Sequence, residues 1–199
     1  PSSMHEFGGQ VMHAVDKARE QVKDFLGARD AKEIIFTASG SEGDNMAIRG
    51  VLEANKNKKH IITTKIEHPA VLNVYKYLEK QGYDVTYLDV DSKGNLDLNQ
   101  LAESITDETA LVSIMYANNE TGVILPVEKA AKIVKAKNPK IKFHSDAVQA
   151  AGKIPLDVKN TDIDLLTIAG HKIHAPKGIG ALYILSLIHI SEPTRRSYI

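Results

Sequence analysis

Apolar and polar residues follow two different periods along this chain. One is the 3.6-residue period of an amphipathic helix, and the other is a short run of strand-forming residues. The first predicts helices at 8–26, 43–55, 69–82, 98–106 and 126–137. Between them lie seven runs that predict strands: EIIFTA, HIITTK, DVTYLDV, ALVSIMYA, IKFHSDA, DLLTIA and GALYI.

The order of these elements predicts an α/β fold. Several of the predicted strands are apolar throughout, as strands covered on both faces are. Helices between such strands indicate βαβ units, and hence a mostly parallel sheet between two layers of helices. Because ligands bind beyond the carboxyl ends of parallel strands, the residues after each strand are the first candidates for a site.

The turn after the first predicted strand, ASGSEGDN, is built from small residues and runs into a helix. Free backbone N–H groups and the positive end of the helix dipole favour an anion there. Ser39, Gly40 and Ser41 are therefore candidates for wrapping a phosphate. The alternative is an ordinary N-cap in a strand-to-helix loop.

Two further strand ends carry polar side chains. His68 precedes Pro69, which suits the first turn of a helix, so its ring is expected to face the cleft or simply to cap the helix. The stretch NNETG offers the amides of Asn118 and Asn119 and the carboxylate of Glu120, although turn chemistry alone also explains such a loop.

Asp146 follows a predicted buried strand, with Gln149 three residues later. A buried carboxylate requires a partner, because an unpaired buried charge is costly. The protonated ring nitrogen of a ligand meets that need, and so does a structural salt bridge.

The segment TIAGHKIHAPKG contains two histidines and two lysines. His171 and His174 suggest a metal site only weakly, since no third ligand is near in sequence. Lys177 reads as an exposed charge. Lys172 follows a buried strand and a glycine, so its amine is expected in the cleft, partly desolvated. Desolvation lowers a lysine pKa and favours Schiff-base formation.

One ligand satisfies all these groups together. Pyridoxal 5′-phosphate has a phosphate for the Ser39–Ser41 turn, a ring nitrogen for Asp146, an aromatic face for His68 and an aldehyde for Lys172. The order of these groups along an α/β chain makes the combination more specific than any single motif.

Composition narrows the function further. The 199 residues include 25 Lys+Arg and 25 Asp+Glu, so the charge balance gives no footprint for nucleic acid or an anionic membrane. No apolar stretch approaches 20 residues, so no membrane span is expected. The chain has no cysteine, which excludes disulfides and thiolate metal ligands within it. A cytoplasmic location fits these features.

Six stretches of the chain resemble cysteine desulfurases of the NifS/IscS type, which belong to the class V aminotransferases: PSSMHEFG, FTASGSEGDNMAIRG, EHPAVLN, SIMYANNETGVI, HSDAVQAAGKIP and GHKIHAPKGIGALY. The resemblance covers residues 1 to about 184, and NNETG is more like the NifS/IscS branch than the SufS branch. It implies the large pyridoxal-phosphate-binding domain of fold type I, lacking its N-terminal start and the C-terminal portion that follows.

The resemblance also implies roles for individual residues. Lys172 matches the lysine that bonds to the cofactor, and Asp146 matches the carboxylate on the pyridine nitrogen. His68 matches the histidine stacked on the ring, which is proposed to move protons as well. Gln149 and Asn119 match amides near the phenolic oxygen.

The remaining matches concern the phosphate, where Gly40, Ser41 and His171 match contact residues. Two departures stand out. Ala169 replaces the family's usual serine, so one phosphate hydroxyl is missing. Ser41 replaces the more usual threonine and keeps its hydroxyl.

In the family, L-cysteine yields alanine, and a separate catalytic cysteine keeps the sulfur as a persulfide for iron–sulfur cluster or thio-cofactor assembly. Because this chain has no cysteine, we expect it to lack desulfurase turnover as written. The resemblance further implies a homodimer when full length and a sulfur-acceptor or scaffold protein as partner.

Two rival functions remain at this stage. Other class V members are aminotransferases or lyases that need no catalytic cysteine, and a non-catalytic scaffold domain is the second alternative. The tail from Leu185 changes character abruptly, and LSLIHISEPTR resembles a translated sequencing adapter. We therefore interpret 185–199 as non-native and give it no weight in the argument.

Overall fold

The computed structural model describes residues 6–185, so the tail interpreted as non-native, 185–199, lies outside the described residues except for Leu185. The helices are α1 (Glu6–Leu26), α2 (Gly40–Ala54), α3 (Pro69–Lys80), α4 (Leu98–Ser104) and α5 (Val127–Lys137). The strands are β1 (Ile34–Thr37), β2 (His60–Thr64), β3 (Asp84–Leu88), β4 (Thr109–Ser113), β5 (Lys142–Asp146), β6 (Leu165–Ala169) and β7 (Gly180–Ile184). Short 3₁₀ turns, η1 (Ala31–Glu33), η2 (Val158–Asn160) and η3 (Gly170–Lys172), complete the description.

The seven strands form one sheet in the order β1-β7-β6-β5-β4-β2-β3. Neighbouring strands in the part β6-β5-β4-β2-β3 are parallel, and β7 runs antiparallel to both β6 and β1. The chain therefore delivers the carboxyl ends of β1, β2, β4, β5 and β6 to one edge of the sheet. That edge carries the loops from which the site is built.

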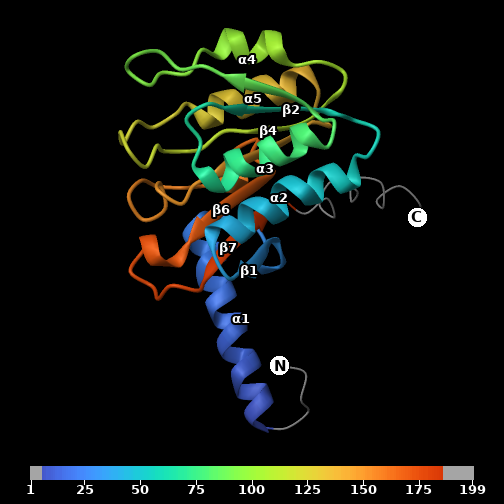
Figure 1. The fold of residues 1–199 in the computed structure, drawn as a ribbon. Coiled ribbons are helices and arrows are strands. Elements are labelled where there is room, and N and C mark those ends of the chain that lie inside the picture. Colours follow the sequence, from blue (N-terminus) through green and yellow to red (C-terminus); the bar gives the residue numbers. More distant parts are fainter. Residues whose placement is uncertain (1–5, 186–199) are drawn as a thin grey trace, which may run out of the picture.

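Helices cover the two faces of the sheet in separate layers (Figure 1). On one face, α2 and α3 pack their apolar stripes on Ile61, Leu111, Leu165 and Leu182. On the other, α4 and α5 pack on alternate strand residues such as Val112, Phe143 and Leu166. Burial of both faces explains the continuous apolar runs of the central strands. The prediction of a three-layer fold with a mostly parallel sheet is confirmed.

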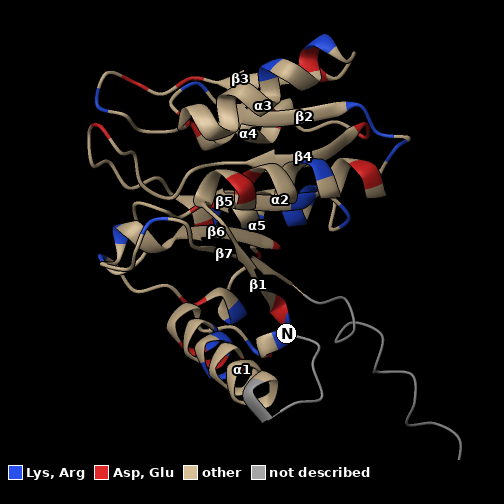
Figure 2. Cartoon of the chain, turned by 60° about the horizontal axis from the view of Figure 1, so that its bottom comes forward, with Lys and Arg blue, Asp and Glu red and all other residues tan. Residues whose placement is uncertain are grey.

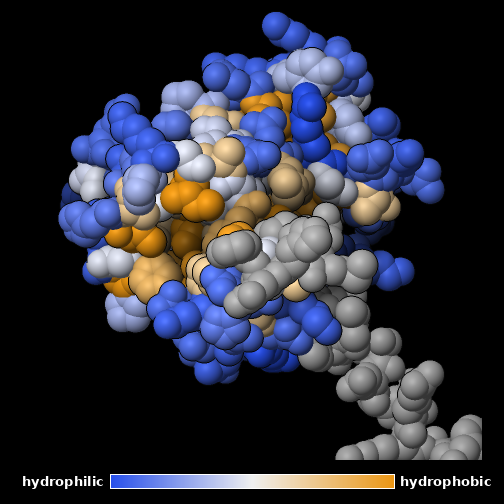
Figure 3. Space-filling model, turned by 90° about the horizontal axis from the view of Figure 1, so that it is seen from below, coloured by the Kyte–Doolittle hydropathy of each residue, from blue (hydrophilic) through white to orange (hydrophobic). Residues whose placement is uncertain are grey.

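Helix α1 extends away from the sheet, touching it near β1 (Figure 1). Its Val11, Met12 and Phe25 side chains are exposed. Seen from below, apolar side chains gather in a hollowed area within a hydrophilic surround (Figure 3). Lysine, arginine, aspartate and glutamate are interspersed along the helices and loops (Figure 2). Within residues 6–185, no helix combines the length and apolar composition that crossing a bilayer requires.

Two details differ from the sequence prediction. Helix α2 begins at Gly40 rather than at 43, because the Ser39 side chain accepts the backbone N–H of Glu42 and starts the helix there. Strand β7 was expected only as a strand, whereas the structure inserts it antiparallel between β1 and β6. The edge strand β3 is partly exposed, unlike the central strands.

Two glycines of α2 should respond in opposite ways to alanine. A Cβ on Gly43 would lie 2.8 Å from the Thr167 Cγ2 atom, whereas a Cβ on Gly50 meets nothing within 4 Å. We expect Gly43→Ala to lower the free energy of unfolding by about 1–3 kcal/mol through overpacking. Gly50→Ala should raise it by about 0.5–1 kcal/mol, since alanine favours the helix. Urea unfolding of both variants checks this, and equal effects would contradict the close packing of α2 on β6.

Candidate active site

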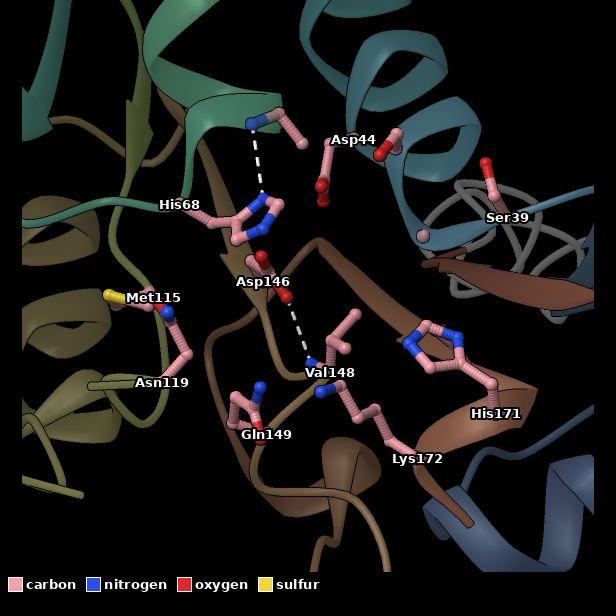
Figure 4. Close-up of a pocket in the computed structure, with 14 residues that line it drawn as sticks. Ser39, Asp44, His68, Met115, Asn119, Asp146, Val148, Gln149, His171 and Lys172 are labelled. Carbon is pink, nitrogen blue, oxygen red and sulfur yellow. Dashed lines mark hydrogen bonds between the residues drawn. The ribbon is translucent and has the colours of Figure 1, made fainter. Parts of the chain in front are cut away.

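A cavity of about 240 Å³ opens at the carboxyl edge of the sheet (Figure 4). It is bounded by the N-terminal turns of α2 and α3 and by the loops after β4, β5 and β6. All eight residues to which the family resemblance gives a role line it. The complete lining is Ser39, Gly40, Ser41, Asp44, His68, Ala70, Met115, Asn119, Asp146, Val148, Gln149, Ala169, His171 and Lys172.

The start of α2 forms one wall of the cavity. Ser39 caps the helix, and Glu42 reaches back to accept the N–H of Ala38. Gly40 lies so close to the loop after β5 that a Cβ would be 2.9 Å from the Val148 Cγ2 atom. The capping alternative is therefore real, and the same turn also presents a helix N-terminus to the cavity, where an anion is favoured.

His68 serves as the N-cap of α3, with Pro69 at the first helical position. Its Nδ1 accepts the backbone N–H of Ala70 at 3.1 Å, drawn as a dashed line in Figure 4. This bond makes Nδ1 the acceptor, so in the neutral ring the proton belongs on Nε2. The capping alternative and the cavity-facing prediction both hold for this histidine.

Asp146 ends β5 with only 5% of its surface exposed. Its Oδ1 accepts the N–H of Val148 at 2.9 Å. Burial raises the pKa of this carboxyl, and the Val148 N–H and the nearby His68 ring oppose the rise. Within the described part of the chain, no lysine, arginine or histidine forms an ion pair with it. The structural salt bridge considered from the sequence is therefore not what the structure contains.

The two asparagines of NNETG have separate roles. Asn118 is buried: its amide donates to the Ile66 carbonyl, and its Oδ1 accepts the N–H groups of Glu120 and Thr121. It organises the turn, as the alternative reading proposed. Asn119 is exposed and lines the cavity, facing Gln149 from the loop after β5.

Lys172 and His171 follow β6 in the turn η3 (Gly170–Lys172). Both line the cavity, and both are exposed. The Lys172 amine points into the cavity toward Val148 and Gln149 (Figure 4), and its partial desolvation stays a prediction. His174 adopts a φ of 66° and is not among the cavity-lining residues. Within residues 6–185, no group of three or more His, Asp or Glu side chains is arranged to hold a metal ion.

Asp44 is a cavity-lining residue to which the sequence reading gave no role. It is 1% exposed, and its carboxyl points into the cavity near Asp146 (Figure 4). A signal was present in the sequence: Asp44 occupies the apolar stripe of α2, between the buried positions Gly40 and Ala47. A carboxylate on that stripe is unusual and marks a site or a polar contact.

Glu67, just before His68, was missed as well. It is 4% exposed, and its Oε1 accepts the Met115 N–H at 2.7 Å and the Thr64 hydroxyl at 2.9 Å. These bonds tie the turn that carries His68 to the end of β4. Burial raises the pKa of Glu67 to about 8, so the side chain is largely a neutral acid at pH 7.

Different parts of the cavity present chemically different groups. A helix N-terminus that favours an anion lies at one side, and a buried carboxyl that favours a protonated nitrogen lies deeper. The Lys172 amine, which points into the cavity, can reach a carbonyl there, and an imidazole with an N–H in the cavity can hold or pass a proton. These four groups suit a planar, phosphorylated aromatic aldehyde.

Comparison with known proteins agrees with this geometry. Residues 1–195 match the family described as Aminotransferase class-V. The chain is 64% identical over 184 residues to a cysteine desulfurase of Nostoc sp., covering 92% of this chain and 45% of that protein. It is 51% identical over 184 residues to the cysteine desulfurase NifS of Azotobacter vinelandii, with the same two coverages.

Solved structures give the same result. A NifS-like protein superposes with a TM-score of 0.89 at 44% identity, covering 92% of this chain and 50% of that chain. A structure titled SspA in complex with cysteine superposes with a TM-score of 0.87 at 41% identity, covering 92% of this chain and 52% of that one. The chain thus spans about half the length of the curated relatives and solved structures it matches.

Proposed function

Because this chain belongs to the class V aminotransferase family, we propose that it is the cofactor-binding part of a pyridoxal-phosphate-dependent cysteine desulfurase. The observation that carries the proposal is the shared cavity. Residues far apart in sequence, each fitted to a different part of one cofactor, line the same 240 Å³ space. The names of the most similar relatives favour desulfuration over other reactions of the family.

The residues present fit pyridoxal phosphate. The turn of Gly40 and Ser41 at the start of α2 offers a cradle for phosphate that a Cβ on Gly40 would fill, and His171 lies beside it. Asp146 suits the protonated ring nitrogen. His68 lies where an aromatic ring can stack, and the amides of Asn119 and Gln149 suit the phenolic oxygen.

In this proposal, bound pyridoxal phosphate supplies an electron sink for bonds at the substrate's α-carbon. The protein supplies position and proton transfer. Lys172 would hold the cofactor covalently through its Nζ, and in its free form the same amine would take or return a proton. His68 holds a proton on Nε2, since Nδ1 is occupied by the Ala70 N–H. Asp146 fixes the orientation of the ring and favours its protonated nitrogen.

Sulfur transfer requires a thiol that these 199 residues do not contain. We therefore propose that the sulfur-accepting cysteine lies outside these 199 residues. L-cysteine is the substrate, in keeping with the relatives' names. We further propose that the full-length protein is a homodimer in the cytoplasm, with a sulfur-acceptor or scaffold protein as partner. The sulfur is delivered to iron–sulfur cluster or thio-cofactor assembly. The exposed Val11, Met12 and Phe25 of α1 support a protein partner on that helix.

The test is a titration of the purified chain with pyridoxal phosphate, followed by absorption spectroscopy and equilibrium dialysis. We expect saturable binding with a shifted absorption band. Pyridoxal, which lacks the phosphate, should bind at least about ten-fold more weakly, since charge-assisted hydrogen bonds at the α2 turn are lost. A folded chain that binds neither compound would overturn the cofactor assignment and favour the scaffold alternative.

Restoring the hydroxyl that Ala169 lacks should tighten binding. Ala169 is fully buried, and its Cβ lies 3.4 Å from where a Cβ on Gly40 would be, beside the start of α2. We expect Ala169→Ser to lower the dissociation constant for pyridoxal phosphate by about ten-fold, the effect of one hydrogen bond to a charged group. Affinity for pyridoxal should not improve. An equal gain for both compounds would show that the new hydroxyl does not contact the phosphate.

A further inference from the structure

A row of buried polar side chains crosses the sheet beneath the cavity. We call Thr63, Ser113, His144 and Thr167 the polar row. It lies on the α2 face, since Ile61, Leu111 and Leu165, two residues earlier on β2, β4 and β6, pack with α2. The His144 ring bonds the Ser113 Oγ at 2.8 Å through Nδ1 and the Thr167 Oγ1 at 3.0 Å through Nε2. All four are 0% exposed.

Asp44 lies between this row and the cavity. Its Oδ1 is 3.6 Å from the His144 Nε2, too far for a hydrogen bond, and the atom has no hydrogen-bond partner among the described residues. The carboxyl is directed toward Asp146 and His68 in the cavity (Figure 4). A carboxyl that is almost fully buried, with one oxygen unpartnered and facing a cavity, needs a physical account, because burying such a charge is costly.

Within residues 6–185, no lysine or arginine forms an ion pair with Asp44, although Lys172 lines the same cavity. From β5, His144 is neutral, since burial lowers its pKa to about 3. Also from β5, Asp146 adds a second carboxyl, and Glu67 adds a third from the turn before α3. From β6, the Thr167 hydroxyl is the group that favours the charged form. His68, across the cavity, acts on Asp146.

Like carboxyls that share a site do not both ionise readily. Asp146 has two groups that favour its charge, the Val148 N–H and the His68 ring, whereas Asp44 has the Thr167 hydroxyl alone. Burial is the first cause that raises the pKa of Asp44 well above its ordinary value, and Asp146 is the second. The negative charge of the pair therefore belongs on Asp146.

We propose that Asp44 is a positioning residue of the site: it stands in the cavity wall as a neutral acid and so keeps the negative charge on Asp146. This rests on the proposed function, because that charge is what a protonated ring nitrogen meets. When Asp146 is neutralised, the second cause that raises the pKa of Asp44 is removed, so Asp44 ionises more readily and can act as the carboxylate of the cavity.

A double-mutant cycle tests the coupling between the two carboxyls. We expect Asp44→Asn to raise the dissociation constant for pyridoxal phosphate at least about ten-fold more in an Asp146→Asn background than in the wild type, because the double variant leaves the ring nitrogen without a carboxylate. Equal cost in both backgrounds would overturn the proposal, since two independent residues give additive effects. So would a larger cost in the wild type, which would assign the charge to Asp44.

A second readout needs no cofactor. A neutral buried acid contributes stability that is present below its unfolded pKa and is lost as pH rises toward the folded value. The melting temperature of Asp44→Asn minus that of the wild type should therefore be larger at pH 8 than at pH 4, by about 4 °C or more. In Asp146→Asn, which keeps Asp44, the melting temperature should fall less with rising pH than it does in the wild type. Profiles parallel to the wild type in both variants would overturn the proposal.

These measurements also separate the proposal from the function on which it rests. If the wild type binds no pyridoxal phosphate, the proposed function fails while the melting profiles still report the state of Asp44. If the wild type binds pyridoxal phosphate and the effects of the two substitutions are additive, the proposed function stands and Asp44 has only a structural role.

Discussion

The Lys172→Ala variant should lose the absorption band of the lysine-bound cofactor entirely. A primary amine in the cavity is the group that bonds to the cofactor aldehyde, and Lys172 supplies it from η3. The phosphate cradle remains, so the variant should still bind pyridoxal phosphate reversibly and more weakly. Absorption spectra at saturating cofactor measure the first effect, and dialysis measures the second.

Lys177 is the matched control, because it is an exposed lysine five residues later that does not line the cavity. Lys177→Ala should keep the full band. After reduction with borohydride, mass spectrometry of the wild type should find the added group on the peptide that holds Lys172. A band that persists in Lys172→Ala, or a label on Lys177, would sink the covalent assignment.

Glu67→Gln should remove much of the pH dependence of folding. Burial raises the pKa of Glu67 from 4.5 to about 8. Its contribution to stability is present below pH 4.5 and is lost progressively until pH reaches about 8. The wild type should thus lose up to about 4–5 kcal/mol of unfolding free energy over that window from this group. Glutamine stays neutral and can keep both hydrogen bonds of Oε1.

Urea unfolding at several pH values between 5 and 9 measures this. We expect Glu67→Gln to gain stability over the wild type as pH rises. Glu67→Ala should be less stable than Glu67→Gln at every pH, because the Met115 N–H loses its acceptor. Glu103→Gln, an exposed carboxyl on α4, is the control and should follow the wild-type profile. If the stability of Glu67→Gln falls with rising pH as steeply as that of the wild type, Glu67 is ionised in the folded chain.

The order and type of the helices and strands could be predicted from the sequence alone. Two hydrophobic periods are directly readable because a helix repeats every 3.6 residues and a buried strand is apolar throughout. The position of the site followed from the same reading, since polar residues placed after parallel strands meet at one edge. Gly40, His68, Asp146 and Lys172 were found in this way, and the structure brings them to one cavity.

How these residues are held in place depends on contacts between distant segments of the folded chain. The close approach of α2 to β6 distinguishes Gly43 from Gly50, although both are glycines of one helix. The exposure of Lys172 depends on how η3 leaves the sheet, and the antiparallel insertion of β7 depends on pairing between distant segments.

The same holds for Asp44 and Glu67, whose protonation is set by what surrounds them. In the sequence each is simply an acidic residue. Only packing excludes water from its carboxyl and brings other carboxyls near it. Periodicity is a local property of the chain and can be read along it. Burial, electrostatic coupling and hydrogen-bond partnership arise between segments distant in sequence, and so they exist only once the chain has folded.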